Sequence, residues 1–294
     1  MEKAISKAAV LIEAMPYIQR FRDKVVVIKF GGNAMSDKAI NNNVLRDIVF
    51  MELVGMKPVL VHGGGSAISK EMKKVGKEPV FSSGLRVTDL ETIRIVEKTL
   101  FESVNKELVI LVKKFGGRAK PVSGNRDRII NAAKKRFYDP ENPGKEINLG
   151  YVGEVKKVNP AKIRKICDEG VIPVIAPLGY GKKGEVFNIN ADHAAAEIAA
   201  ALKAEKLVFL TNVKGVMVNR GDDEAYLIPS INVREIEKLK MSKVITGGML
   251  PKVDSCIHAV KSGVHKTHVI DVKIQHSLLL EIFTDKGIGT EIIV

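Results

Sequence analysis

Short runs of apolar residues, many of them β-branched, recur along the chain with little polar alternation. This pattern is typical of strands that are buried on both faces, as in a parallel sheet. The predicted strands lie at Lys24 to Phe30, Pro58 to Val61, Val171 to Pro177, Lys206 to Leu210, Thr267 to Asp271 and Thr290 to Val294. We therefore expect a mainly parallel sheet whose strands come from the whole length of the chain.

Between these runs, apolar residues return at the spacing of amphipathic helices. The predicted helices lie at Lys38 to Gly55, in a stretch ending near Gly76, and at Glu91 to Phe115, Ala191 to Lys203 and Pro251 to Gly263. Strand, glycine loop and helix follow one another twice before Gly76, which indicates βαβ units. The pattern predicts one doubly wound α/β sheet with an N-terminal and a C-terminal lobe.

Two segments fall outside this alternation. Residues 121–158 are rich in Gly, Pro, Asn and charge, and we expect hairpins and loops there, at the edge of the first lobe. Before the first strand, Ala4 to Phe21 places Ile5, Ala8, Ile12 and Met15 on one helical stripe. Such a helix either folds back on the sheet or binds a partner and interlocks subunits.

The charge balance raises the question of a nucleic-acid partner. The 294 residues contain 47 Lys and Arg against 34 Asp and Glu, a formal charge of +13. Aromatic residues are only 5%, however, and neither a zinc-finger spacing nor a long basic run is present. Small polyanionic ligands also suit a basic protein, because its field draws them into a cleft. The charge alone is explained most simply by solubility and next by a small anionic ligand, and we expect no nucleic acid.

Membrane insertion and disulfide bonds are not expected. No apolar run reaches the roughly 18 residues needed to span a bilayer, and the N-terminus makes a poor secretory signal. Cys167 and Cys256 are far apart and form no CxxC pair. A reducing cytoplasm fits this usage best.

Two glycine loops are the first candidates for chemistry. Gly31-Gly32-Asn33 and Gly63-Gly64-Gly65 each follow a buried strand and precede a helix. Backbone N–H groups in such loops can approach an anion at a helix N-terminus. Neither loop matches GxGxxG or the Walker motif GxxxxGK[ST], which weakens a Rossmann dehydrogenase and a Walker-type ATPase. A plain tight turn is the alternative for either loop taken alone.

Charged residues at strand and helix ends extend this candidate site. Lys29 stands at the end of an apolar strand and Lys252 at the start of a helix, where both could stabilise a phosphoryl group in transfer. The alternative for Lys29 is a strand-end lysine whose ammonium reaches solvent. Arg86 could bind a carboxylate through two hydrogen bonds, or it could form an ordinary ion pair on the surface. The Asn188-Ile189-Asn190-Ala191-Asp192 segment could hold substrate, although Asn190 or Asp192 could also be a plain N-cap. His62 fits a packed turn residue better than a general base.

These residues occur within six motifs that together resemble the amino-acid kinase family. The motifs are Ile28 to Met35 (IKFGGNAM), Val61 to Gly65 (VHGGG), Gly84 to Asp89 (GLRVTD), Phe187 to Asp192 (FNINAD), Gly247 to Lys252 (GGMLPK) and Leu278 to Thr290. The resemblance extends from Lys24 to Val294 and is strongest to the branch that phosphorylates N-acetyl-L-glutamate. It implies a three-layer αβα sandwich around a mainly parallel open sheet.

The resemblance also implies an activity and roles for individual residues. The activity is transfer of the ATP γ-phosphoryl group to the γ-carboxylate of N-acetylglutamate, in arginine biosynthesis. Gly64 and Gly65 would bind the acyl amino acid, and Arg86, Asn188 and Asn190 would hold its carboxylate and amide. The catalytic group would be Lys29, Lys252 and Asp192, and the phosphate loop Gly31, Gly32, Asn33 and Gly63. Phosphoryl transfer to an ionised carboxylate needs positioning and positive charge but no general base.

The nucleotide is expected in the C-terminal lobe. The resemblance places ATP on residues of two segments, namely Asn212, Lys214, Gly215, Val216, Met217, Val244, Ile245 and Thr246. Mg²⁺ would bridge the ATP phosphates, with few or no protein ligands. The implied division is an oligomerisation helix at 1–22, a substrate lobe with a dimer interface at about 23–178, and an ATP-binding lobe at about 179–294.

Regulation is implied by the two ends of the chain. Arginine-inhibited relatives carry an N-terminal helix that joins dimers into a hexamer, and His268, Glu281 and Gly287 match the arginine motifs. Asn212 replaces the usual Asp of the nucleotide loop, and Val272 replaces a Gly close to the arginine site. A nitrogen-signalling protein is a possible partner. The alternatives are another family enzyme, such as an aspartate kinase, and a non-catalytic sensor or nucleic-acid-binding protein on the same fold.

Overall fold

The computed structural model describes residues 1–139, 142, 144–219, 225–284 and 287–294, and the side chains of Lys3, Lys7, Asn33 and Asn219 are not among those described. Its centre is an eight-stranded sheet in the order β14-β16-β15-β11-β1-β2-β8-β5. Six of these strands are parallel, and β16 and β14 run opposite to them. The strands are β1 (Val25–Phe30), β2 (Lys57–His62), β5 (Ala119–Ser123), β8 (Ile172–Ala176), β11 (Lys206–Thr211), β14 (Ser230–Asn232), β15 (Lys266–Asp271) and β16 (Thr290–Ile293).

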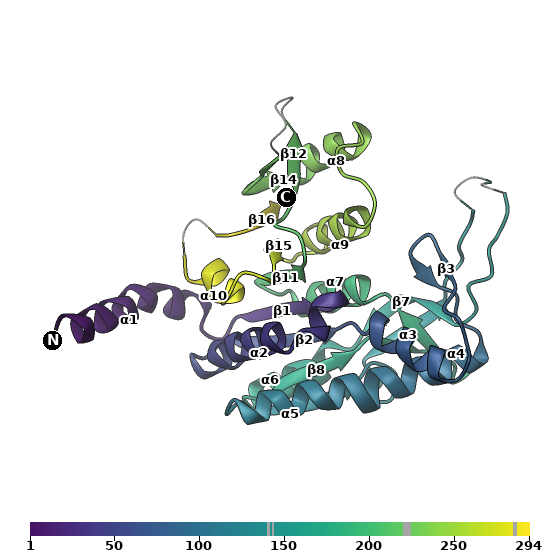
Figure 1. The fold of residues 1–294 in the computed structure, drawn as a ribbon, viewed down its shortest axis with the longest axis horizontal. Helices are drawn as coiled ribbons and strands as arrows, with labels where there is room; N and C mark the ends of the chain where they lie inside the picture. Colours follow the sequence, from purple (N-terminus) through teal and green to yellow (C-terminus); the bar gives the residue numbers. More distant parts are fainter. Residues whose placement is uncertain (140–141, 143, 220–224, 285–286) are drawn as a thin grey trace.

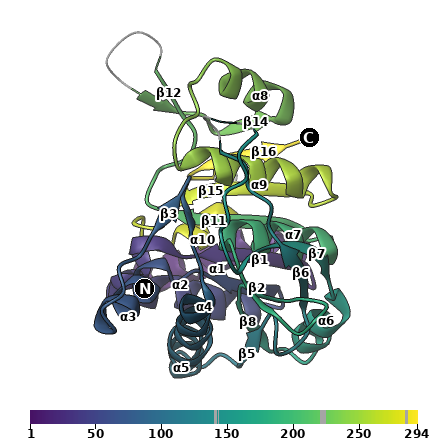
Figure 2. The same cartoon turned by 90° about the vertical axis from the view of Figure 1, so that its right-hand side faces the viewer.

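Helices cover both faces of this sheet (Figures 1 and 2). One layer contains α6, α7, α8 and α9, and the other contains α2, α5 and α10. Their bounds are α2 (Lys38–Leu53), α5 (Lys106–Lys114), α6 (Pro160–Asp168), α7 (Ala191–Leu202), α8 (Val233–Met241), α9 (Met249–Lys261) and α10 (Ser277–Ile282). Successive β1 residues alternate between the layers, because Val27 packs under α7 while Val26 and Ile28 pack under α2. This confirms the predicted three-layer α/β architecture.

Apart from the N-terminal helix, the remaining elements lie outside the central sheet. They are α3 (Gly65–Lys74), β3 (Phe81–Ser82), β4 (Leu85–Arg86), α4 (Leu90–Glu97), β6 (Ile130–Lys134), β7 (Val152–Val158), β9 (Leu178–Tyr180), β10 (Val186–Ile189), β12 (Met217–Asn219), β13 (Ala225–Leu227), the 3₁₀ turn η1 (Gly32–Ser36) and the π-helix η2 (Lys98–Asn105). Strands β6, β7, β9 and β10 form a second, closed four-stranded unit.

The expectation of only hairpins and loops at residues 121–158 is partly wrong. Residues 119–123 form β5, the edge strand of the central sheet, in parallel register with β8. Pro121 is tolerated there because an edge strand leaves one side of its backbone unpaired. The rest of the segment does contain the antiparallel pair β6–β7. The predicted helix at residues 91–115 forms as α4 and α5, with π-helical hydrogen bonding between them.

Helix α1 (Glu2–Phe21) does not fold back on the sheet. It projects from one side of the molecule, with the N-terminus at its far end (Figure 1). Phe21 is buried, whereas Ile5, Val10, Leu11 and Ile12 are 60–67% exposed. The apolar stripe predicted from the sequence therefore faces solvent in the single chain, which is the state that a partner-binding helix would present.

Both cysteines are free and buried, as expected from their spacing. Burial raises the pKa of each thiol to about 12. Among the described residues, no helix is long and apolar enough to cross a membrane.

Candidate active site

Two cavities meet at the carboxyl end of β1. The first, of about 220 Å³, lies beyond β1 and β2, and its polar lining includes Gly64, Gly65, Arg86, Asn188, Asn190 and Asp192. The second, of about 450 Å³, lies beyond β1 and β11, and its polar lining includes Gly31, Thr211, Asn212, Thr246, Gly248 and Lys252. Lys29 and Gly32 line both cavities. Because β2 and β11 pair with opposite sides of β1, the junction lies where the sheet order reverses, the usual ligand position in open α/β folds.

Lys29, Asp192 and Lys252 form the charged centre of this junction. Asp192 Oδ1 lies 2.7 Å from Lys29 Nζ, and Asp192 Oδ2 lies 2.7 Å from Lys252 Nζ. Burial lowers the pKa of Lys29 more than the Asp192 charge raises it, and the Lys252 charge lowers it further. Burial alone would raise the pKa of Asp192, but the two lysines outweigh it and hold that pKa below its ordinary value. The structure thus brings the three predicted catalytic residues together.

Three different elements deliver these side chains. Lys29 is the second-last residue of strand β1, Asp192 lies in the first turn of α7, and Lys252 lies in the first turn of α9. The Asn190 side chain caps α7 by accepting hydrogen bonds from the N–H groups of Asp192 and His193. The N-cap expected at this position is therefore Asn190, and it orients the turn that carries Asp192.

The glycine loops are needed for a close approach of two backbones. A Cβ on Gly31 would lie 3.1 Å from the Gly63 Cα, and the Gly63 N–H donates to the Phe30 carbonyl at 2.8 Å. A Cβ on Gly64 would lie 2.5 Å from Leu100 Cδ2. Helix α3 starts at Gly65, so its first N–H groups have no partner inside the helix and can bind an anion in the first cavity. Of the predicted phosphate-loop residues, Gly32 and Gly63 line the first cavity, and Gly31 and Gly32 line the second. The side chain of Asn33 is outside the described part.

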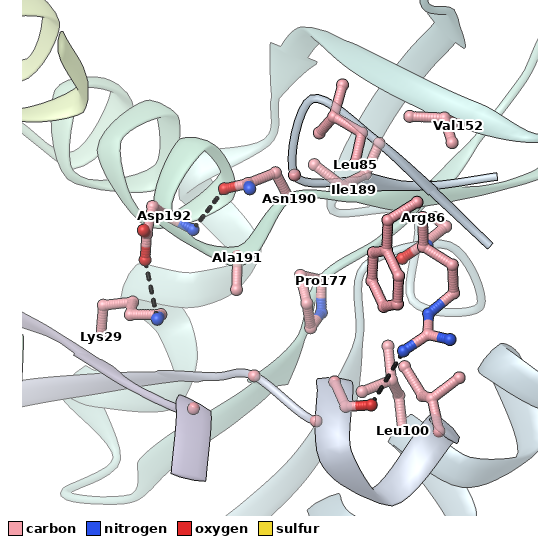
Figure 3. A pocket seen from close by; sticks show the side chains of 18 residues that line it. Lys29, Leu85, Arg86, Leu100, Val152, Pro177, Ile189, Asn190, Ala191 and Asp192 are labelled. Carbon is pink, nitrogen blue, oxygen red and sulfur yellow. Dashed lines mark hydrogen bonds and ion pairs between the residues drawn. The ribbon is translucent and has the colours of Figure 1, made fainter. Parts of the chain in front are cut away.

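Arg86 is buried and does not form the surface ion pair that was its alternative. Its Nη2 donates to the Gly65 carbonyl at 2.9 Å and to Ser69 Oγ at 2.7 Å, and its guanidinium lies over the Phe81 ring. In Figure 3, Arg86 lies on the opposite side of the first cavity from the pair of Lys29 and Asp192. The sequence reading missed Ser69 and Phe81, since neither stands in a motif.

Asn188 belongs to β10 of the closed four-stranded unit. Its Nδ2 donates to Thr88 Oγ1 at 3.3 Å, and its side chain lines the first cavity together with apolar residues. The apolar lining consists of Ile68, Phe81, Leu85, Leu100, Val152, Pro177 and Ile189. This cavity therefore combines cationic ends with an apolar wall.

The predicted nucleotide residues separate into two groups. Asn212 and Thr246 line the second cavity. Lys214, Gly215, Val216, Met217, Val244 and Ile245 do not line it. Val216 and Ile245 are buried in the core, and a Cβ on Gly215 would lie 2.5 Å from Thr290 Oγ1. Packing alone therefore explains the positions of Gly215, Val216 and Ile245.

The predicted arginine residues come together at a third cavity of about 300 Å³. Glu281 and Gly287 line it, beside Tyr17 and Arg20 of α1. His268 is buried behind it, with Nδ1 2.7 Å from Glu281 Oε1. Burial raises the pKa of Glu281, but the contact with His268 and the hydrogen bond from the Ile288 N–H outweigh it, so the pKa lies below its ordinary value. Gly287 has a φ of 59°, which favours glycine.

Val272 does not impose strain at this site. It is buried in the core, its N–H donates to the Thr211 carbonyl at 2.8 Å, and it is not among the described residues with positive φ. The backbone of this chain therefore does not need glycine at position 272.

His62, at the end of β2, is fully buried. Its Nδ1 lies 2.8 Å from the Gly63 carbonyl oxygen and its Nε2 lies 3.0 Å from Asn105 Nδ2. Burial lowers the pKa of the imidazole to about 4. His62 is therefore a neutral packed residue at physiological pH, as its position in the sequence indicated.

We expect this histidine to make the fold acid-sensitive. The unfolded chain binds a proton on His62 below its ordinary pKa of about 6.5, whereas the folded chain does so only near pH 4, so stability falls as the pH drops through this window. Two and a half pH units correspond to about 3 kcal/mol. Urea unfolding at pH 7 and pH 4 should therefore show the wild-type free energy of unfolding falling by about that much more than that of His62→Asn. Parallel declines in both proteins would contradict this.

Comparison with known proteins identifies the family to which the chain belongs. The profile of the amino acid kinase family matches residues 24–271. The chain belongs to this family, as its six motifs indicated.

Individual relatives narrow the comparison. The chain is 48% identical over 296 residues to the acetylglutamate kinase of Heliobacterium modesticaldum, covering 100% of both chains. It is 46% identical over 286 residues to the acetylglutamate kinase of Cupriavidus metallidurans, covering 97% of this chain and 91% of that one.

A solved structure is also similar. The N-acetylglutamate synthase of Neisseria gonorrhoeae, complexed with coenzyme A and N-acetyl-glutamate, gives a TM-score of 0.83 at 27% identity. That match covers 98% of this chain and 63% of the synthase, so this chain spans under two thirds of that protein. The same synthase complexed with coenzyme A and L-arginine gives a TM-score of 0.79.

Proposed function

We propose that this chain transfers the γ-phosphoryl group of ATP to the γ-carboxylate of N-acetyl-L-glutamate. The named relatives at 46–48% identity, aligned over nearly the full chain, support this activity in arginine biosynthesis. One structural observation carries it further: two separate cavities share Lys29 and Gly32 at their junction. Such a junction suits a reaction between two bound molecules, because their reacting ends meet beside a fixed positive charge.

The first cavity suits the acyl amino acid. Arg86 would hold its α-carboxylate, and the N-terminus of α3 at Gly64 and Gly65 would donate N–H groups to its anionic end. Asn188 and Asn190 would contact its amide. The apolar wall around Leu85 and Ile189 suits a methyl group, which an aspartate or free glutamate lacks.

The second cavity suits the nucleotide. Its polyphosphate would lie against Gly31, Gly32 and the N-terminus of α9, and Asn212 and Thr246 line the same cavity. Lys29 and Lys252 would stabilise the charge that spreads over the phosphoryl oxygens in transfer, and Asp192 would hold both ammonium groups in place. The acceptor carboxylate is already ionised at neutral pH, so no side chain has to remove a proton.

Mg²⁺ fits this arrangement as a cation carried by the nucleotide. Both oxygens of Asp192 already contact a lysine, and among the described residues no three His, Cys, Asp or Glu side chains gather to hold a metal ion. When bound to the ATP phosphates, the ion would neutralise part of their charge. The protein would then contribute positive charge to the phosphoryl group only through Lys29, Lys252 and the loop N–H groups.

A product assay tests the proposed function. Hydroxylamine traps an acyl phosphate as the hydroxamate, and the purified protein would be incubated with ATP and N-acetylglutamate, glutamate or aspartate. We expect product with N-acetylglutamate well above the other two acids. Equal product from all three, or preference for aspartate, would remove the assignment and favour another enzyme of the family.

Arginine is the proposed inhibitor at the third cavity. Its lining includes three carboxylates, Glu205, Glu281 and Glu291, which can receive a guanidinium and an α-amino group. Residues of α1 and of the C-terminal segment both contribute, so a bound ligand would contact the projecting helix and the kinase core together. Titration of the purified protein with arginine would measure the inhibition.

We further propose that α1 assembles dimers into a hexamer. The predicted stripe includes Ile5, Ile12 and Met15, which are 61%, 64% and 45% exposed and form an apolar surface that a second helix can bury. Removing residues 1–21, or replacing the exposed pair Leu11 and Ile12 by Glu, should reduce the mass in solution from a hexamer to a dimer. Size-exclusion chromatography with light scattering measures this. A dimer for the unmodified chain would contradict the hexamer.

The cytoplasm is the proposed location, because both thiols are free. A nitrogen-signalling partner remains a prediction.

A further inference from the structure

A buried polar chain runs from the middle of the long helical segment to the glycine loop of the first cavity. Asn105, at the end of η2, donates from Nδ2 to the Val174 carbonyl at 2.8 Å and lies 3.0 Å from His62 Nε2. His62 Nδ1 in turn lies 2.8 Å from the Gly63 carbonyl oxygen. Both side chains are 0% exposed. Polar groups at this depth cost free energy unless every contact has the right donor and acceptor.

The contacts of Asn105 determine where the protons lie along this row of hydrogen bonds. A carbonyl oxygen can only accept, so the Asn105 atom facing Val174 must be the amide nitrogen. That nitrogen lies 3.0 Å from His62 Nε2 and 3.5 Å from the Val122 carbonyl oxygen, so its second hydrogen points to the nearer Nε2, which is then the unprotonated ring nitrogen. The single proton of the neutral imidazole is then on Nδ1, where it donates to the Gly63 carbonyl.

The last hydrogen bond controls a peptide unit of the active site. The Gly63 carbonyl and the Gly64 N–H belong to the same planar peptide, in which they point in opposite directions. A carbonyl held inward by His62 therefore turns the Gly64 N–H outward, towards the first cavity that Gly64 lines. On the preceding peptide, the Gly63 N–H is held by the Phe30 carbonyl of β1.

We propose that Asn105 and His62 are positioning residues, which set the orientation of the Gly63–Gly64 peptide so that its N–H faces the acyl amino acid. They touch neither cavity, and they act through the backbone of the loop. The inference rests on the proposed assignment of the first cavity to N-acetylglutamate. The π-helical segment contributes because it ends at Asn105 and delivers the amide beneath the carboxyl ends of β2 and β8.

Two substitutions separate this role from ordinary packing. Asn105→Leu keeps the volume and removes the donor, so the imidazole loses the hydrogen bond that fixes its ring and can turn away from the Gly63 carbonyl. His62→Asn keeps a donor close to the position of Nδ1. We expect Asn105→Leu to raise the KM for N-acetylglutamate about tenfold, the effect of one lost hydrogen bond, with the KM for ATP unchanged. His62→Asn should restore most of the affinity that His62→Leu loses.

The matched control is Val109→Ala, a buried position on α5 that follows Asn105 along the helical segment. It removes core volume and should lower stability while leaving both KM values unchanged. Equal increases in both KM values for Asn105→Leu, or no rescue by His62→Asn, would overturn the inference.

A spectroscopic measurement needs no variant to fold. Long-range ¹H–¹⁵N correlation spectra of the wild-type protein, with ¹⁵N-labelled histidine, distinguish the two imidazole tautomers. We expect the His62 proton on Nδ1. A wild-type proton on Nε2 would overturn the inference. Failure of the proposed function would instead appear in the wild-type product assay, with no acyl phosphate from N-acetylglutamate, whatever the tautomer.

Discussion

Replacing Lys29 or Lys252 by alanine is expected to lower kcat by about 10²- to 10³-fold, the usual effect of removing one preorganised charge from a site of charge development. Each ammonium lies 2.7 Å from a different oxygen of Asp192, so neither lysine can take over the position of the other. Lys29 should give the larger effect, since it lines both cavities and is the more deeply buried of the two.

Steady-state kinetics with both substrates would measure this loss. The matched control is Lys57→Ala, on the neighbouring strand β2 but at its opposite end, where the ammonium pairs with Asp168 on the surface. That variant should retain wild-type kcat. Near-normal turnover in Lys29→Ala or Lys252→Ala would remove that lysine from the mechanism.

Asp192→Asn should damage both catalysis and the fold. The substitution leaves two neighbouring ammonium groups without their shared counter-charge, one of them at a side chain that is only 9% exposed. Removing one partner of a buried ion pair costs about 3 kcal/mol or more. We expect the free energy of unfolding to fall by about that amount, and kcat to fall by at least as much as in either lysine variant.

Urea unfolding and kinetics on the same preparation would measure both losses. Asp168→Asn is the control, because it also breaks a lysine–carboxylate pair but at a carboxylate that is 62% exposed. Surface pairs of this kind contribute little, so its stability should stay within about 1 kcal/mol of the wild type. Wild-type stability in Asp192→Asn would show that the two lysines do not depend on this carboxylate.

The sequence predicted those parts of the fold in which burial is visible in the residue pattern. Strands β1, β2, β8 and β11 are apolar on both faces because helices cover both, so their runs needed no tertiary information. Strand β5 was missed, since Lys120 and Pro121 interrupt its pattern and only pairing with β8 makes it a strand. The π-helical segment was also missed, because its hydrogen bonding leaves no mark on the apolar spacing.

The candidate site was predicted to the extent that its residues stand in motifs. The motifs supplied Lys29, Arg86, Asp192 and Lys252, and the structure brings them to one edge of the sheet. Asn105 was not found, because it is far from the glycine loop in the sequence and reaches His62 only through the packing of η2. The position of α1 was likewise open from spacing alone, and its exposed stripe excludes folding back on the sheet.

The charges at the junction of the two cavities have a consequence for the acyl substrate. Lys29, Lys252 and Arg86 contribute three positive charges, and Asp192 contributes one negative charge, so the site carries a surplus of two. N-acetylglutamate has two carboxylates, and its arrival neutralises this surplus. The bound dicarboxylate also favours the protonated form of Lys29, whose pKa burial lowers. Substrate binding would thereby help to maintain the charge on Lys29, to which the proposed mechanism assigns stabilisation of the phosphoryl group.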